Sequence, residues 1–168
     1  GLSGPLSGHH MMLLDWQKKL PDAKLSPVFY KGAADQNAAL LGGEVDMMFG
    51  NLNDVMRSLD EFRVLALAAE KRNDFLPDVP TMREGDIDIV SDIRRCFAAP
   101  KGVDPEKIKT LREIFRKISM DPDYIADMKK AGQPYEYMSG EDFAKYIDSQ
   151  TEKARQALSE AGLLKKKK

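Results

Sequence analysis

The chain has 168 residues, of which 26 are Lys or Arg and 27 are Asp or Glu, so its formal net charge is −1. This balance gives no reason to expect nucleic-acid binding, and no apolar run is long enough to cross a bilayer. The single cysteine, Cys96, excludes an internal disulfide framework and argues against a cysteine-based zinc cluster; its strand-like surroundings predict a small buried residue.

Helical and strand-like segments alternate through the first hundred residues. Apolar spacing predicts helices over residues 10–19, from 32 to 41 and through 55–59. Apolar runs predict strands at 27–30, 45–49 and 62–69; an ordered loop at 71–85 and strand candidates at 87–90 and 94–99 follow. The order strand, helix, strand favours parallel pairing with crossover helices. The sequence therefore predicts an α/β lobe with a mostly parallel sheet and flanking helices.

The remainder of the chain is predicted to be helical. Asp104-Pro105-Glu106 combines a capping side chain, a proline at the first helical position and an acidic first turn. Asp121-Pro122-Asp123 repeats this signal, and Ser139 precedes a third helix, with Gly132 and Gly162 as the ends of the last two. We divide the chain into the α/β lobe at 1–97, a helical segment at 98–164 and a solvated lysine tail at 165–168.

Three loops are candidate ligand sites. The loops at 31–33 and 50–53 lie where ligands of parallel α/β sheets bind, beyond the carboxyl ends of the strands, and the loop at 1–10 leads directly into a helix N-terminus. Free N–H groups at the helix N-termini that follow such loops suit a carboxylate or a phosphate. The candidate residues are, in chain order, Ser3, Ser7, Gly8 and His10; Tyr30, Lys31, Gly32 and Ala33; and Asn51 and Asn53.

Each of these loops also has a purely structural interpretation. Ser and Gly are the usual residues of helix caps and loops, Lys31 suits an exposed loop, and Asn51 or Asn53 suits a helix cap. The pair His9-His10 is alternatively a surface pair or an expression-vector remnant, and it offers too few ligands for a metal. No catalytic motif and no cofactor motif is recognisable. A small hydrolase that uses Ser7 with His10, and a non-binding interaction module, remain as alternative functions.

The order and spacing of several segments resemble the receptors of the tripartite tricarboxylate transporters, also called the Bug family. The segments are Tyr30-Lys31-Gly32-Ala33-Ala34, residues 40–49, Leu76-Pro77-Asp78-Val79-Pro80-Thr81 and Ala98-Ala99-Pro100-Lys101-Gly102. The resemblance extends from the loop of Ser7 to about Leu164. It implies a type II periplasmic-binding-protein fold with two lobes, and a non-enzymatic receptor that binds a small organic acid and passes it to membrane subunits.

The resemblance also implies where the ligand binds and where the protein is located. It assigns ligand contacts to Ser7 and His10, to Tyr30, Lys31 and Gly32, and to Asn51, in a protein that is periplasmic or a cell-surface lipoprotein. It covers only the last half of a full receptor, so the helices after Pro100 are expected to expose an apolar surface or to pair with another chain. Residues 91–97 depart from the family pattern, and Arg94 or Arg95 supplies either an extra cation for the ligand or a structural salt bridge.

Overall fold

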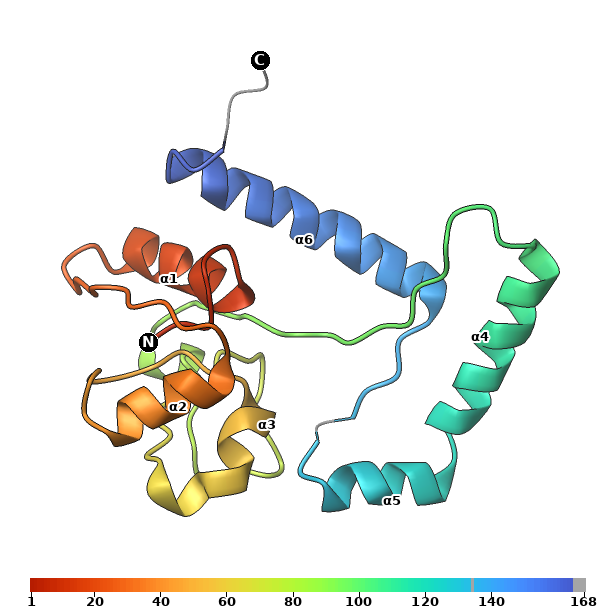
Figure 1. The fold of residues 1–168 in the computed structure, drawn as a ribbon, viewed down its shortest axis with the longest axis horizontal. Helices are drawn as coiled ribbons and strands as arrows, with labels where there is room; N and C mark the ends of the chain where they lie inside the picture. The colour runs from red at the N-terminus through yellow and green to blue at the C-terminus, as the bar shows by residue number, and fades with distance from the viewer. Residues whose placement is uncertain (134, 165–168) are drawn as a thin grey trace. The chain divides into compact units, whose positions relative to one another are not determined.

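The computed structural model describes residues 1–133 and 135–164, and Figure 1 shows its helices. In chain order they are α1 (Gly8–Lys19), α2 (Ala33–Leu41), α3 (Leu52–Val55), the 3₁₀ helices η1 (Met56–Glu61) and η2 (Arg83–Gly85), α4 (Pro105–Ser119), α5 (Pro122–Lys130) and α6 (Gly140–Glu160). The chain forms two compact units, one of residues 1–93 with the chain from 154 onward and one of residues 94–153. The division at 97 stays a prediction, and the lysine tail at 165–168 lies outside the described residues.

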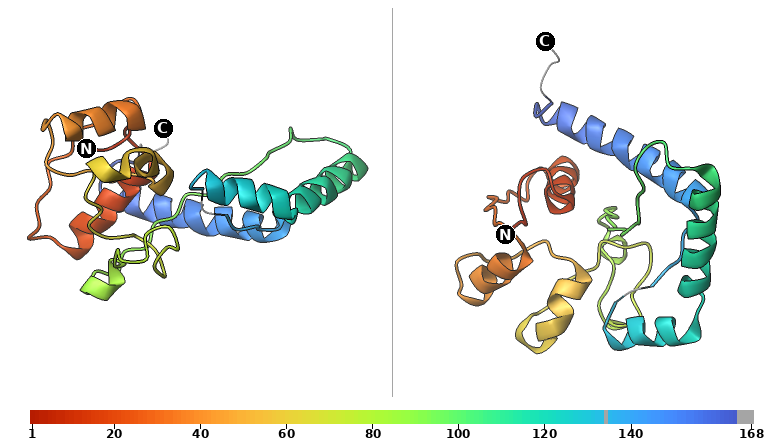
Figure 2. Two further views of the ribbon diagram at one scale, coloured as in Figure 1. Left: turned by 90° about the horizontal axis from the view of Figure 1, so that it is seen from below. Right: turned by 45° about the vertical axis from the view of Figure 1, so that its right-hand side comes forward.

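The helix boundaries in the first unit follow from local chemistry. The hydroxyl of Ser7 accepts a hydrogen bond from the His10 N–H at 3.3 Å and so caps α1. Gly43, with a φ of +72°, follows α2 in the left-handed conformation that glycine adopts easily. α3 lies beside α2 (Figure 2), where the Asn37 side-chain amide donates to the Asp54 carbonyl at 3.1 Å. The helices predicted at 10–19 and 32–41 are confirmed.

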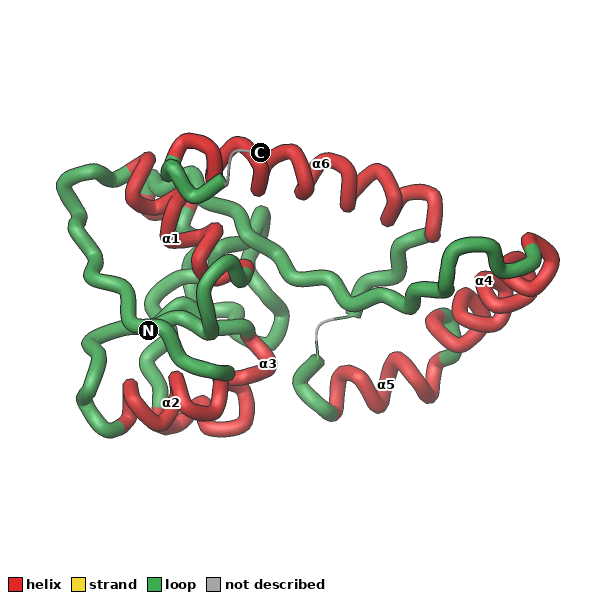
Figure 3. The backbone as a smooth tube through the Cα atoms, turned by 45° about the horizontal axis from the view of Figure 1, so that its top comes forward, coloured by secondary structure: helices red, strands yellow, loops and turns green. Residues whose placement is uncertain are grey.

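The predicted parallel sheet is not confirmed. Within the described residues the extended segments form three isolated bridges, two parallel (Leu2 with Phe29 and Leu67 with Thr81) and one antiparallel (Asn73 with Leu76). Figure 3 accordingly colours these segments as loop. Residues 1–2, which we call the middle segment of the lobe, make hydrogen bonds on both sides.

The middle segment lies between two later segments and runs parallel to both. On one side the Leu2 N–H donates to the Val28 carbonyl at 2.9 Å, and the Tyr30 N–H donates to the Leu2 carbonyl at 2.8 Å. On the other side the Gly1 nitrogen donates to the Met47 carbonyl at 2.6 Å, and the Phe49 N–H donates to the Gly1 carbonyl at 3.2 Å. The three segments therefore have their carboxyl ends on the same side.

The core of this unit joins α1 to these segments. Leu2, Leu13 and Phe49 are buried together, and partly buried side chains surround them: Met12, Trp16, Leu25 and Met47. Full burial of an aliphatic side chain contributes about 1.5–3 kcal/mol, so this cluster holds α1 firmly against the segments that lead to the candidate loops.

The loop at 71–85 is ordered by charge pairing. The Arg72 guanidinium donates to the Glu84 carboxylate at 2.7 Å, and the same carboxylate accepts from the Thr81 N–H at 2.7 Å. These hydrogen bonds, first that from Arg72, lower the pKa of Glu84 to about 2. The predicted ordered loop is thus confirmed, with a short 3₁₀ turn at its end.

The second unit contains α4, α5 and the first part of α6. Asp104 accepts from the Glu106 N–H at 2.9 Å, Asp121 accepts from the Asp123 N–H at 2.9 Å, and Ser139 accepts from the Asp142 N–H at 3.1 Å. All three predicted caps are therefore confirmed.

The predicted apolar face of the helical segment is exposed. No residue of α4, α5 or α6 is buried, and apolar side chains such as Leu111, Ile114 and Ile118 face the solvent. Pairing of this face with another chain stays a prediction. Within the described part of the chain, no helix is both long and apolar enough to span a membrane.

Two predictions for residues 94–97 are decided by side-chain contacts. Arg94 forms an ion pair with Glu136 at 3.3 Å and lies 5.0 Å from the centre of the Tyr146 ring, which favours its structural interpretation. Cys96 is exposed, so its predicted burial is wrong; the segment that carries it does not join a sheet. The neighbouring Phe97 stacks on Phe115 of α4, with 4.2 Å between ring centres.

Candidate functional site

The three loops predicted from the sequence lie together. Each follows the carboxyl end of one of the three parallel segments: residues 3–7 follow the middle segment, 31–32 follow 28–30, and 50–51 follow 47–49. α1, α2 and α3 begin directly after these loops (Figure 1). Tertiary structure thus brings the candidate residues to one edge of the lobe, where α/β proteins bind ligands.

Ser7 and His10 are occupied by structural hydrogen bonds. The Ser7 hydroxyl donates to the Gly4 carbonyl at 2.8 Å and accepts from the His10 N–H. The His10 ring accepts from the Leu6 N–H through Nδ1 at 3.0 Å and meets the Phe29 ring edge-on at 5.1 Å. Both residues shape the loop before α1, and no hydrogen bond joins the Ser7 hydroxyl to the His10 ring in the described structure.

The neighbouring histidine, His9, occupies the centre of a hydrogen-bonded chain. It is 5% exposed, so its interpretation as half of a surface pair is wrong. Its Nδ1 lies 2.7 Å from the Ser3 hydroxyl oxygen, and its Nε2 lies 3.2 Å from Oδ1 of Asn51. His9 therefore connects the first candidate loop to the third, through Ser3 on one side and Asn51 on the other.

The third loop is organised around the carboxylate of Asp54. Its Oδ2 accepts from the Asn51 amide at 2.9 Å, and its Oδ1 accepts from the Asn53 amide at 2.9 Å. Asn51 stands at the N-cap position of α3 but makes no capping hydrogen bond with its side chain. Asn51 and Asn53 are thus ordered by Asp54, with the oxygen of Asn51 directed to His9.

The second loop leaves open space before α2. Tyr30, Gly32 and Ala33 are partly buried, and Lys31 is exposed. Gly32 is the N-cap residue of α2, its backbone is extended, and nothing lies within 4 Å of the position that a Cβ would occupy. The first N–H groups of a helix have no partner within the helix. A ligand can therefore approach the α2 N-terminus closely.

Gln36 is a buried residue of the same lobe that was not among the residues predicted from the sequence. It is 1% exposed, and its Nε2 donates to the Gly1 carbonyl at 3.1 Å and to the Phe49 carbonyl at 2.7 Å. Its Oε1 is buried without a hydrogen-bond partner in the described residues. The available signal was its spacing, because Ala39 and Leu40 follow it at the intervals of one helix face.

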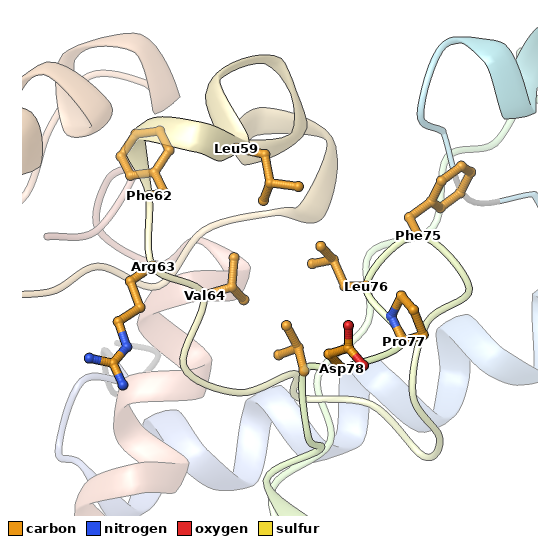
Figure 4. Close-up of a pocket in the computed structure, with 9 residues that line it drawn as sticks. Leu59, Phe62, Arg63, Val64, Phe75, Leu76, Pro77 and Asp78 are labelled. Atoms are coloured by element: carbon orange, nitrogen blue, oxygen red, sulfur yellow. The ribbon is translucent and has the colours of Figure 1, made fainter.

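A separate hollow of about 380 Å³ lies away from these loops, between residues 59–64 and 75–79 (Figure 4). Its walls are mostly apolar, with Leu59 and Phe62 on one side and Phe75 and Pro77 on the other. None of the predicted ligand residues lines it. Arg63 and Asp78 are the charged residues that line it, and they carry opposite charges. A carboxylate requires several hydrogen-bond donors, so the loop edge fits an anion better than this hollow does.

Comparison with solved structures shows which known fold the chain shares. The protein R. palustris Rpa4515 with adipate is similar with a TM-score of 0.83 and 20% identity, over 96% of this chain and 56% of that chain. A TctC solute-binding protein from Polaromonas is similar with a TM-score of 0.75 and 24% identity, over 95% of this chain and 56% of that chain. A third structure, described as a periplasmic transporter, has a TM-score of 0.77 and 22% identity, over 96% of this chain and 55% of its own.

The chain belongs to the tripartite tricarboxylate transporter family receptors, whose model matches residues 4–163. This is a family of receptors and not of enzymes. A curated relative, the UPF0065 protein in gbd 5'region of Cupriavidus necator, is 28% identical over 167 residues, which are 98% of this chain and 50% of that protein. The chain therefore spans about half the length of the relatives that it matches.

Proposed function

We propose that the protein captures a small organic carboxylate and delivers it to the membrane subunits of a tripartite transporter, as a periplasmic protein or a surface lipoprotein. The observation that carries this proposal is the meeting of three donor-rich loops at the carboxyl ends of three parallel segments. Membership in the receptor family and the similarity to a protein described with adipate support it. A dicarboxylate is therefore the first ligand to test.

The carboxylate is held by the edge that contains the three loops. Backbone N–H groups at the start of α2, next to Gly32 and Ala33, donate to one carboxylate oxygen, and Lys31 adds a positive charge. The loops that contain Ser3, Tyr30, Asn51 and Asn53 end at the same edge, so these residues are further candidates for contact with the ligand. Ser7, Gly8 and His10 contribute through the first turn of α1, because Ser7 and His10 already make loop hydrogen bonds. Closure of a second lobe in the intact protein traps the ligand.

A matched pair of glycine substitutions tests this geometry. Gly32→Val fills the open space before α2, whereas Gly85→Val fills a space that is equally open but remote from the loops. One hydrogen bond to a charged group contributes about 1.5–3 kcal/mol, so Gly32→Val is expected to raise the Kd for a bound dicarboxylate at least about tenfold. Gly85→Val is expected to leave the Kd within about twofold of the wild-type value.

The measurement is isothermal titration of the intact protein with adipate, other dicarboxylates, tricarboxylates and aromatic acids, accompanied by thermal-shift assays. Heat of binding and a raised Tm with at least one acid support the proposal. If none of these acids gives heat or a shift, the protein is not a carboxylate receptor.

The alternative hydrolase has no support in the geometry of the pair on which it depends. The Ser7 hydroxyl donates to a backbone carbonyl, and the His10 ring accepts from a backbone N–H. A serine nucleophile requires a hydrogen bond to its base. We therefore expect no hydrolysis of generic esters that depends on Ser7. Wild type and Ser7→Ala should show the same turnover.

A further inference from the structure

A chain of hydrogen bonds links Ser3, His9, Asn51 and Asp54. The carboxylate of Asp54 at its end determines which atom donates in each bond. Asp54 is a carboxylate whose oxygens accept from two amides, those of Asn51 and Asn53. The Asn51 side chain must therefore direct its NH₂ group to Asp54 and its oxygen Oδ1 to His9. The opposite orientation would place the Asn51 oxygen 2.9 Å from a carboxylate oxygen, with no proton between them.

This orientation determines the proton positions on His9. Because Oδ1 of Asn51 only accepts, the Nε2 atom at 3.2 Å carries a hydrogen and donates it. In a neutral imidazole the other nitrogen, Nδ1, is then an acceptor. The Ser3 hydroxyl, whose oxygen lies 2.7 Å away, donates its single proton to Nδ1.

In this state Ser3 has the wrong polarity for an anion. Its one proton is directed at His9, so its oxygen offers only lone pairs to a ligand in the loops. A carboxylate also offers only lone pairs, so the two oxygens repel each other. The polarity is reversed when His9 takes up a proton, since Nδ1–H then donates to the Ser3 oxygen and the Ser3 proton turns to the ligand.

We propose that His9 is a positioning residue that couples the binding of a carboxylate at Ser3 to the uptake of one proton. The inference rests on the proposed function, and it assigns a role to a residue that makes no ligand contact of its own. On binding, a proton from solvent adds to Nδ1 of His9, the Ser3 hydroxyl rotates, and its hydrogen bond passes from His9 to the carboxylate. No other bond forms or breaks.

The charges around His9 are compatible with this exchange. Asp54 reaches it through Asn51 from the side of α3, and the Nε2–H group donates to Oδ1 of Asn51 in both protonation states of His9. His10 follows it on α1, Tyr30 and Lys31 stand in the second loop, and the middle segment with Ser3 carries no charged side chain. Because the uptake of a proton accompanies binding, the affinity for a carboxylate falls as the pH rises, by up to about tenfold per pH unit.

The first test is titration of the intact protein with adipate in buffers of different ionisation enthalpy, which gives the number of protons taken up per bound ligand. We expect a value that approaches one as the pH of the titration is raised, and a value near zero in His9→Gln, whose side chain at this position cannot take up a proton. His10→Gln is the matched control and retains the uptake, whatever its effect on affinity. Uptake that persists in His9→Gln, or binding without uptake in the wild type, overturns the inference and leaves the proposed function intact.

A second measurement needs neither a ligand nor a variant. The ¹⁵N shifts of the His9 ring in the free protein at high pH distinguish the two tautomers. Hydrogen on Nε2 supports the inference, and hydrogen on Nδ1 overturns it. If none of the acids binds, the proposed function fails, whereas the tautomer still decides whether the hydrogen-bonded chain has the direction assigned to it.

Discussion

Gln36 provides the most direct test of how the lobe is held together. Its side-chain amide donates to the Gly1 and Phe49 carbonyls, which belong to the middle segment and to the segment that leads to Asn51. Gln36→Ala removes both hydrogen bonds and leaves a void where a buried side chain stood. The segments lose their common attachment to α2, so the loops at their ends are expected to open more often.

The expected cost follows from the contacts. A buried hydrogen bond contributes about 0.5–1.5 kcal/mol, and each carbonyl left without a donor adds to that loss. Removal of the unpartnered Oε1 recovers part of it. We therefore expect Gln36→Ala to destabilise the lobe by about 2–4 kcal/mol. Gln36→Met keeps most of the volume while it removes both the hydrogen bonds and the unpartnered oxygen, so a smaller loss of about 1–2 kcal/mol is expected.

The assay is native-state hydrogen exchange of the intact protein, with the local free energy of opening read from peptides over residues 28–49. Asn37→Ala is the matched control on the same helix, because it removes one hydrogen bond from a partly buried amide, and it should cost about 0.5–1.5 kcal/mol. If Gln36→Ala costs no more than Asn37→Ala, the two hydrogen bonds do not hold the segments together and the reasoning is refuted.

Two further predictions concern a helix cap and an ion pair. Ser7→Ala removes the cap of α1 and is expected to lower the free energy of unfolding, measured in urea, by about 1 kcal/mol. Ser7→Asp retains a capping acceptor and should retain most of the stability. Equal losses in the two variants would contradict the capping role. Glu84 has a pKa of about 2, below its usual value near 4.5, so its ionised form stabilises the fold above pH 4.5, and this contribution is lost as the pH falls through about 2. Wild type should therefore exceed Glu84→Gln in Tm above pH 4.5, and the two should converge in acid; a pH-independent difference would show that the pairing with Arg72 is not responsible.

Local signals in the sequence predicted the helices well, because their causes lie within a few residues. Asp104 and Asp121 cap helices that begin at the next residue, and each accepts from an N–H two positions further on. Gly132 and Gly162 follow their helices with positive φ. Such interactions need no partner from elsewhere in the chain, so they are readable without a structure.

The apolar runs were less informative about the sheet. Residues 45–49 have the composition of a buried strand, yet their two hydrogen bonds to the middle segment both go to one residue, Gly1. Strand pairing depends on a partner that is distant in sequence, so the composition of one segment does not specify whether it pairs. The same reasoning explains Cys96, which lies in a strand-like run and is exposed.

By itself the sequence determined the receptor family, the helices and the three loops that meet at one edge. Only the tertiary structure decided which side chains in those loops act together. His9 and His10 are adjacent and chemically identical, but successive residues of a helix point about 100° apart, so one is buried between Ser3 and Asn51 while the other faces Phe29. Gln36 likewise reads as an ordinary polar helix residue until the segments of Gly1 and Phe49 lie against it. Hydrogen bonds across 6, 42 and 35 residues exist only once the chain has folded, and these bonds decide the roles of Ser3, Asn51 and Gln36.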